Sequence, residues 1–436
     1  QAWGNADAFD LAASLGEVVD GEILDIMECF VTRAGVPLIE IERVGEKKIR
    51  VRQSRYAQLG VDYEDDAAWS IPITLKHGDE HGEKQRKILL TKREQTFTLD
   101  GPFEWLHPNA NEKGYYRWRL EGVPLAELVD DVKALDERNR LAFINNLDAL
   151  FTAGLVDGGR YLAAIASFGG DPSPEVRQAA ASGLTSFGDG IVPVELKGDY
   201  TRFLTAALRP MLDEIGMEKK PDEHALIEQL RPALINALGW WSDDAEIVAA
   251  ARANARAYME DPHSVDPSVA PPYLRLAAKH GDETLFNAYV AKFESAEVPI
   301  ERSNYLHGLS GFRDEALTRR ALAYALSEKT PPHMFGQIPY KIADDDANRA
   351  MVVEWLGENY PAIQAKIPEQ KISYLPWLAC GQDPRLLETA RGILLTEERK
   401  TQGLEIEFAK AEAVNTLRGK LSARELENVR RFLKER

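Results

Sequence analysis

The sequence predicts a multidomain chain in which a small all-β sandwich is followed by a large all-α solenoid of HEAT-like helical pairs. Between about residues 36 and 120, apolar and polar residues alternate, which is typical of half-buried strands. From Pro124 onward, apolar residues recur at helical spacing almost without interruption. A short helical pattern precedes the strands. The three predicted parts are residues 1–35, 36–122 and 123–436.

The first part reads as two short helices separated by a turn at Gly16. Gly35 and Pro37 end the helical pattern, because neither residue continues a helix. The apolar residues that mark the two helical faces are Phe9, Leu11 and Leu15, then Ile23, Leu24, Met27 and Phe30.

The second part contains six runs in which apolar and polar residues alternate. Turn residues separate these runs at Gly45, at 78–82 and at 100–101. Because short strands joined by such turns pack as two facing sheets, we expect a small sandwich. The six predicted strands are VPLIEIERV, KKIRVRQSRY, WSIPITLKH, RKILLTK, QTFTLDG and YYRWRL.

The third part predicts serial antiparallel helices of about 10 to 16 residues, joined by short Gly, Pro and Asp turns. One well-marked start is Ser173, an N-cap residue that is followed by Pro174 and Glu175 in the first turn. Such helical pairs stack as a HEAT-like solenoid. Their period is irregular, so we do not predict a strict repeat array.

Composition restricts the classes of partner. The formal net charge of −17 predicts no nucleic-acid partner, since a strongly negative surface repels phosphates. No apolar run reaches the roughly 18 residues that span a bilayer, so we expect no membrane partner and a soluble chain, for which the cytoplasm and the periplasm both fit. Cys29 and Cys380 form no disulfide framework. The chain begins with Gln1, and we expect an upstream segment to have been removed.

The stretch KHGDEHGEK, residues 76–84, is the densest cluster of potential metal ligands. His77 and His81 are four residues apart, which is the spacing of two zinc ligands on a helix. Gly78 and Gly82 interrupt the stretch, however, and strands flank it on both sides. Residues four apart do not share a face in a hairpin turn, so we predict a solvated loop and no metal site.

Other candidate residues also have simpler structural interpretations. Gly216, which opens the stretch GME within IGMEKKPDEH, marks a helix end and a loop. His107 and His307 lack a visible catalytic partner. The pair 240–241 is two tryptophans that pack at a helix end, and we expect one of them to be partly exposed. The acidic run 344–346 is predicted to precede a helix. We therefore assign no catalytic and no metal-binding residue in this chain.

The order of elements resembles the carboxyl-terminal half of the aminopeptidase N-like zinc peptidases, peptidase family M-one. That family includes the puromycin-sensitive and endoplasmic-reticulum aminopeptidases. The resemblance covers essentially the whole chain, and its order is more specific than any single motif. The stretches that carry it are DAFDLAASLGEVVDGEILDIMECFVTRAGVPLIEI, VRQSRY, WSIPITL, NEKGYYRWRL, LDERNRLAFINNLDALFTAGL, IGMEKKPDEHALIEQLR and KHGDETLFNAYVAKFESAEVPIERSNYLHGLSGFRDEALTRRAL.

The resemblance implies that residues 1–35 are the last helices of a thermolysin-like catalytic domain that lies upstream. The family's H-E-x-x-H zinc motif and its G-x-M-E-N strand are absent here and would also lie upstream, so no catalytic residue carries over. Phe30 and Met217 stand where the family often has Trp. Arg119 and Leu120 also depart from the family pattern.

The function that the resemblance implies is the non-catalytic C-terminal region of a zinc-dependent aminopeptidase. It would wall and gate the chamber that holds peptide substrates, with zinc in the upstream catalytic domain and no cofactor in this chain. In relatives, basic residues of the helical domain receive the peptide carboxyl end. This chain offers Arg319, Arg320, Lys341 and Arg349 nearby, but has Asp344 where some relatives have Arg, so the substrate-binding residues stay unassigned. The alternative is a standalone solenoid that binds peptides or proteins without catalysis.

Overall fold

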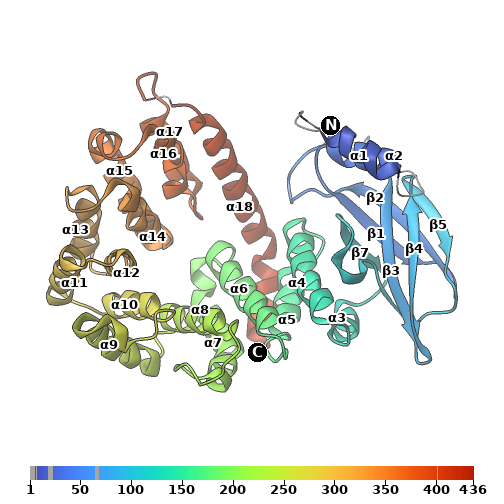
Figure 1. Ribbon diagram of the computed structural model, residues 1–436, viewed down its shortest axis with the longest axis horizontal. Helices are drawn as coiled ribbons and strands as arrows, with labels where there is room; N and C mark the ends of the chain where they lie inside the picture. The colour runs from blue at the N-terminus through green and yellow to red at the C-terminus, as the bar shows by residue number, and fades with distance from the viewer. Residues whose placement is uncertain (1–4, 6, 18–22, 64–67, 400) are drawn as a thin grey trace. The chain divides into compact units, whose positions relative to one another are not determined.

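The computed structural model describes residues 5, 7–17, 23–63, 68–399 and 401–436 (Figure 1). The chain divides into two compact units, residues 1–167 and 168–436. Within the first unit, strands give way to helices between Glu121 and Leu125, where the sequence changes its hydrophobic period. The chain is therefore mostly helical, with a small sheet region near its start.

The two predicted N-terminal helices are present as α1 (Ala8–Gly16) and α2 (Ile23–Thr32). Asp7 caps α1, because its carboxylate accepts hydrogen bonds from the backbone N–H groups of Phe9 and Asp10. The predicted apolar face of these helices is largely exposed: the side chains of Phe9, Leu11, Leu15 and Leu24 all lie at the surface of the unit. The turn was predicted at Gly16, which is the last residue of α1, and Glu17 caps the helix. Residues 18–22 lie outside the described residues.

Two sheets form the β region, as expected for a sandwich. One has the strand order β5-β2-β1-β7 and the other the order β4-β3-β6. Strand β1 runs antiparallel to β2 and parallel to β7. The short strand β6 is the one that alternation misses, because three residues give no readable period. The strands are β1 Pro37–Arg43, β2 Lys48–Arg55, β3 Ile71–Asp79, β4 Gly82–Leu90, β5 Glu94–Thr98, β6 Trp105–His107 and β7 Arg117–Glu121.

Residues 76–84 form the end of the β3–β4 hairpin that contains the turn, as predicted, but the connecting loop is shorter than expected. Asp79 pairs with Gly82 in the register, so only Glu80 and His81 connect the strands. The prediction of a solvated loop is correct for His81, which is exposed, and wrong for His77, which is fully buried within β3. The strand extends through Gly78 because no side chain there opposes the close approach of the ring of Trp105.

Three helices complete the first unit: α3 (Leu125–Lys133), α4 (Glu137–Thr152) and α5 (Gly158–Ala166). Asn146 of α4 fastens the helix to strand β7. Its side-chain amide donates to the carbonyl oxygen of Trp118 (2.9 Å) and its amide oxygen accepts from the backbone N–H of Trp118 (3.0 Å). Both groups are buried, so this pair of hydrogen bonds satisfies backbone atoms that water does not reach.

Acid is expected to destabilise the first unit through His107 of β6. The side chain is 2% exposed, and burial lowers its pKa to about 4. An unfolded chain takes up this proton near pH 6.5, so the stability present above pH 6.5 falls by up to about 3 kcal/mol as the pH drops toward 4. Urea unfolding, followed by the fluorescence of the tryptophans, measures the loss at each pH.

The matched variants for this experiment are His107→Leu and His81→Gln. We expect His107→Leu to be less sensitive to acid than the wild-type chain, because the titrating group is gone. The exposed His81 has no such role, so its variant should follow the wild type. An identical loss of stability in all three proteins would contradict the assignment to His107.

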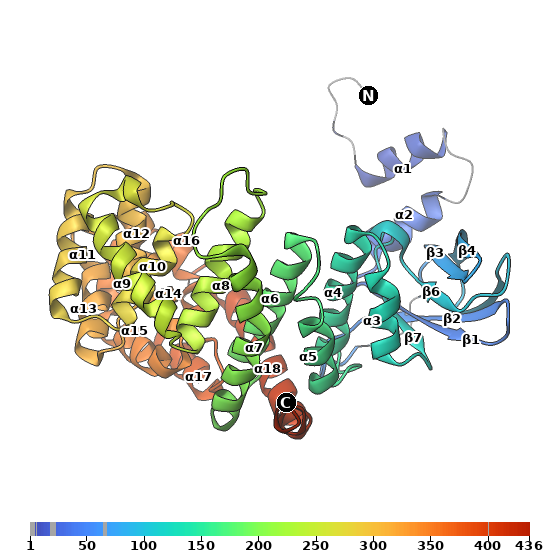
Figure 2. The same cartoon turned by 90° about the horizontal axis from the view of Figure 1, so that it is seen from below.

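The second unit is helical. Figure 2 shows α9, α10 and α12 side by side, and α10 packs against both neighbours. Helix lengths exceed the predicted 10 to 16 residues in four cases within the described residues, since α6 has 17, α7 has 19, α15 has 21 and α18 has 31. The α-helices are α6 Pro174–Gly190, α7 Lys197–Ile215, α8 Ile227–Trp241, α9 Ala245–Glu260, α10 Ala270–Lys279, α11 Glu283–Ser295, α12 Pro299–Leu309, α13 Glu315–Leu326, α14 Pro339–Ala343, α15 Asp346–Lys366, α16 Glu369–Ile372, α17 Pro384–Leu394 and α18 Leu404–Lys434.

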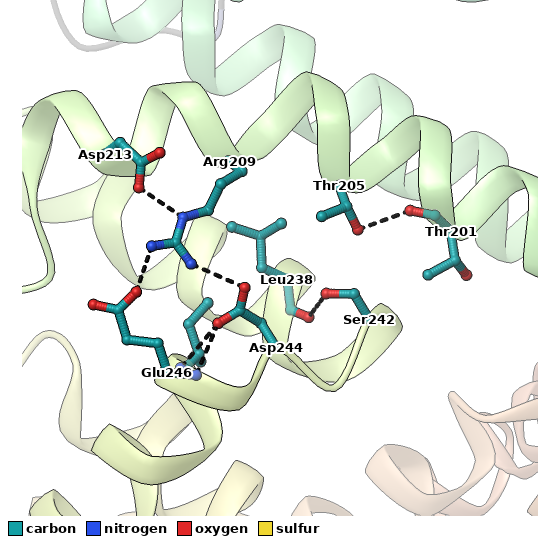
Figure 3. Close-up of polar contacts among 9 residues, drawn as sticks. Thr201, Thr205, Arg209, Asp213, Leu238, Ser242, Asp244 and Glu246 are labelled. Carbon is teal, nitrogen blue, oxygen red and sulfur yellow. Dashed lines mark hydrogen bonds and ion pairs between the residues drawn. The ribbon is translucent and has the colours of Figure 1, made fainter. Parts of the chain in front are cut away.

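Arg209 connects helix α7 to the start of α9 (Figure 3). Its guanidinium donates to Asp213 at 2.6 Å and to Asp244 at 2.9 Å, and it also pairs with Glu246. Asp244 is the N-cap of α9, since its carboxylate accepts from the backbone N–H groups of Glu246 and Ile247. Hydrogen bonds to Glu246, Asp213 and Asp244 raise the pKa of Arg209, so the arginine stays charged and holds the two helices together.

Candidate functional site

The candidate site is a cavity of about 480 Å³ in the second unit, here called the arginine cavity. Its walls come from helices α6, α8, α10, α14, α15 and α18. The 3₁₀ turn η5 (Leu375–Ala379) and Cys380, the residue that follows it, complete the lining. Segments more than 200 residues apart in sequence therefore meet at this point. The charged side chains that line the cavity are Asp189, Arg275, Lys341, Asp344, Arg349 and Arg418.

Arg275 of α10 is the most unusual of these residues. Its side chain is buried, with the residue 7% exposed, and its guanidinium carbon lies 3.8 Å from the ring centroid of Trp240. The buried Nε has no hydrogen-bond acceptor among the described residues. Burial lowers the pKa of Arg275 to about 10, so the group remains charged near neutral pH. A buried cationic donor without an acceptor is costly, and an anion in the cavity would relieve that cost.

Two further arginines add positive charge to the walls. Arg349 of α15 is 6% exposed and pairs with Asp346, but its Nε is also buried and lacks an acceptor within the described part of the chain. Arg418 of α18 is half-buried, and its side chain passes close to Gly190 at the end of α6. Guanidinium groups with free donors are well suited to hold a carboxylate, because they can donate two parallel hydrogen bonds.

Two carboxylates also line the arginine cavity. Asp344 pairs with Lys341 at 2.9 Å. Asp189 lies in the last turn of α6, and among the described residues no side chain or backbone N–H group donates a hydrogen bond to its carboxylate. The residue Asp189 is solvent-accessible, yet desolvation by the surrounding protein and the neighbouring charge of Asp344 raise the pKa of its carboxyl group to about 6. The wall beside Asp189 is fixed by Gln382, whose side-chain amide donates to the carbonyl oxygens of Asp189 and Val192.

A second, apolar cavity of about 710 Å³ adjoins the first. Tyr340 and Trp377 line both cavities, so the two spaces are neighbours within the helical unit. Aromatic and proline residues provide most of the remaining wall, among them Phe335 and Tyr374. The pair of cavities therefore offers one charged and one apolar environment side by side.

The structure brings together some of the basic residues that the sequence suggested. Lys341 and Arg349 line the arginine cavity. Arg319 and Arg320 do not, and instead form surface ion pairs, with Glu315 and Glu354 and with Glu283 respectively. Sequence reasoning missed Arg275 and Arg418. The signal for Arg275 was present, because it interrupts the otherwise buried apolar run YLRLAA in α10.

The remaining candidates lie at helix ends or, in the case of His307, within helix α12. Residues 216–226 form the loop between α7 and α8, with Gly216 at a φ of 79° that suits glycine. The tryptophans at 240–241 end α8, are both half-buried, and both line the arginine cavity. Asp345 caps α15. Burial lowers the pKa of His307 to about 4, so it is neutral at pH 7.

The residues present do not fit a zinc ion. Within the ranges that the structure describes, no three His, Cys, Asp or Glu side chains are grouped so that they could hold a metal. His77 is enclosed in β3 while His81 lies in the exposed turn, so the two histidines of the predicted loop do not converge. Cys29 and Cys380 are both buried free thiols.

The chain combines a β region with helices that enclose a cation-lined cavity. Comparison with known proteins identifies it as a carboxyl-terminal portion of an M1-like aminopeptidase. The chain belongs to the family described as the ERAP1-like C-terminal domain, which matches residues 105–379. That match begins at strand β6 and ends at η5, so it includes most of the arginine cavity.

Several curated proteins are similar to this chain. "Aminopeptidase 2" of Candida albicans is 20% identical over 374 residues, which cover 84% of this chain and 40% of that protein. "Puromycin-sensitive aminopeptidase" of Caenorhabditis elegans is 26% identical over 172 residues, 38% of this chain and 18% of that protein. "Tricorn protease-interacting factor F2" of Thermoplasma volcanium is 24% identical over 226 residues, 51% of this chain and 26% of that protein. The chain thus spans less than half the length of these relatives.

No helix in the described part of the chain is long and apolar enough to cross a membrane.

Proposed function

We propose that this chain is the non-catalytic part of a zinc-dependent aminopeptidase, where it walls the substrate chamber and gates access to it. The observation that carries the proposal is the arginine cavity, in which the buried Arg275 has a donor without an acceptor. The terminal carboxylate of a peptide would supply that acceptor. The helical unit would then hold the carboxyl end of a peptide while a catalytic domain acts on its amino end.

The catalytic domain is the proposed partner of α1 and α2. The exposed side chains of Phe9, Leu11 and Leu15 support this, because a run of large apolar residues on adjacent turns is costly to leave in water. In the proposed enzyme that domain supplies the zinc, which activates the attacking water. The residues of the present chain enclose and position the peptide.

The finer architecture is part of the same proposal. We take residues 1–35 as the end of the catalytic domain, 36–122 as a β-sandwich domain and 123–436 as the helical domain. The packing of α9 on α10, α10 on α12 and α11 on α12 supports a HEAT-like solenoid, because each helix pairs with close neighbours in sequence.

The test is the binding of a peptide by the purified 436-residue chain. Two N-acetylated peptides of identical sequence, one with a free carboxyl terminus and one amidated, are compared by calorimetry. We expect the free acid to bind at least about tenfold more tightly, because charge-assisted hydrogen bonds to arginine contribute about 1.5 to 3 kcal/mol. Equal affinity would contradict the proposed role of the cavity.

The non-catalytic part of the proposal has its own experiment. Amino-acid anilides are incubated with the same chain in the presence of zinc. We expect no hydrolysis, because the described residues offer no group of three side chains that could hold zinc. Zinc-dependent release of the anilide product would overturn the proposal.

A further inference from the structure

The arginine cavity is lined by both positively and negatively charged side chains, and this charge distribution determines which peptide ends it would accept. Arg275, Arg349 and Arg418 contribute positive charge, and the Nε groups of the first two have no hydrogen-bond acceptor among the described residues. Asp189 and Asp344 contribute negative charge. A cavity built only to hold a carboxylate would gain nothing from Asp189, since that carboxylate repels the ligand. The acidic side of the cavity therefore needs its own explanation.

The acidic side is set by Asp189 and the end of helix α6. Asp189 lies in the last turn of this 17-residue helix, where the partial negative charge of the helix dipole adds to that of the carboxylate. Asp344 is close enough to raise the pKa of Asp189, so the two carboxylates repel each other. A cationic group placed between them would remove this repulsion.

The cations already present do not neutralise Asp189. Lys341 pairs with Asp344, and Arg349 pairs with Asp346. The positive groups that face Asp189 are Lys197 of α7, Arg275 of α10 and Arg418 of α18, yet no ion pair joins any of them to it. Asp189 lines the cavity and is solvent-accessible, so its charge is available to a ligand.

We propose that the arginine cavity selects peptides whose carboxyl-terminal residue is lysine or arginine. The terminal carboxylate would lie against Arg275, Arg349 and Arg418, and the cationic side chain would reach Asp189 and Asp344. This assignment rests on the proposed function of the cavity and adds the chemical class of the substrate end. A free basic amino acid carries the same two charges, so the experiment includes it.

The experiment measures the affinity of the 436-residue chain for N-acetylated peptides that differ only in the last residue: lysine, leucine or glutamate. We expect the lysine peptide to bind about tenfold more tightly than the leucine peptide, and the glutamate peptide to bind most weakly. The preference for lysine should shrink from about pH 7 to about pH 5, because Asp189 takes up a proton over this range.

The matched variants are Asp189→Asn and Asp62→Asn. The first should reduce the affinity for the lysine peptide to that for the leucine peptide, while the second changes an exposed residue of the first unit and should leave the preference intact. Equal binding of the lysine and leucine peptides would overturn the selection for a basic residue. If the lysine and leucine peptides bind equally but both bind better than their amidated forms, the selection for a basic residue is wrong while the proposed carboxylate site is supported.

Free lysine provides the last comparison. We expect it to bind much more weakly than the peptide that ends in lysine. Equal affinity would overturn the assignment to a peptide end in favour of a free amino acid. If neither amidation nor the last residue affects binding, both the selection and the carboxylate site are wrong.

Discussion

We expect Arg231→Met to lower the free energy of unfolding of the second unit by about 4 kcal/mol, within the 3 to 5 kcal/mol typical of breaking a buried ion pair. Arg231 of α8 pairs with Glu223 of the preceding loop, and the two side chains are 1% and 4% exposed. Arg231 also donates from Nε to the carbonyl oxygen of Gly216 at 2.9 Å. The methionine would leave a buried carboxylate without its partner.

Urea unfolding of the 436-residue chain measures this loss, and hydrogen exchange of the amides in α8 assigns it to the second unit. The control is Arg202→Met, since Arg202 is an exposed arginine of the same unit that pairs with Asp199. We expect less than about 0.5 kcal/mol for that variant. A similar loss in both variants would contradict the special role of Arg231.

A compensated variant separates the lost ion pair from lost packing. Arg231→Met combined with Glu223→Leu removes both charges and leaves apolar groups in their place. We expect this double variant to recover most of the stability that Arg231→Met loses, because apolar replacements of a buried ion pair are often neutral. No recovery would show that the loop needs the hydrogen bond to Gly216 rather than neutralisation of Glu223.

Alternation of apolar and polar residues was sufficient to predict most of the sheet region. It located at least part of every strand of five residues or more in the described residues. The agreement is clearest for β2 and β3, where buried positions recur at every second residue. It missed β6. The separate interpretation of residues 76–84 as a solvated loop was wrong for His77, because glycines such as Gly78 also occur in strands where another side chain approaches the backbone closely. α7 and α15 are longer than predicted, and the internal prolines Pro210 and Pro361 do not end these two helices. α18 contains no proline and continues over 31 residues.

The candidate site could be predicted only in part. Lys341 and Arg349 were suggested by resemblance, and both line the cavity. Asp189 and Arg418 were not suggested, because 229 positions separate them and periodicity carries no information about which distant helices meet. Arg275 was the exception that local sequence could have revealed, since a charged residue in a buried apolar run requires a partner.

We expect the double substitution Arg275→Met and Arg418→Met to weaken binding of a peptide with a free carboxyl terminus by about 100- to 1,000-fold, or about 3 to 4 kcal/mol. Both arginines line the cavity, and the structure gives neither of them an ion pair with a described residue. They are therefore the cations whose charge is most available to a ligand. Methionine keeps much of the side-chain volume and packs against Trp240 in place of Arg275.

Amidated peptide is the comparison that distinguishes this effect from damage to the fold. The double variant should bind the amide as the wild-type chain does, because the amide lacks the charge that the arginines recognise. Thermal unfolding of the variant checks that the second unit remains folded. The matched control is Arg319→Met combined with Arg320→Met, which removes two exposed arginines outside the cavity and should leave the affinity for the acid unchanged. Equal weakening for acid and amide would refute the role of Arg275 and Arg418 in holding the carboxylate.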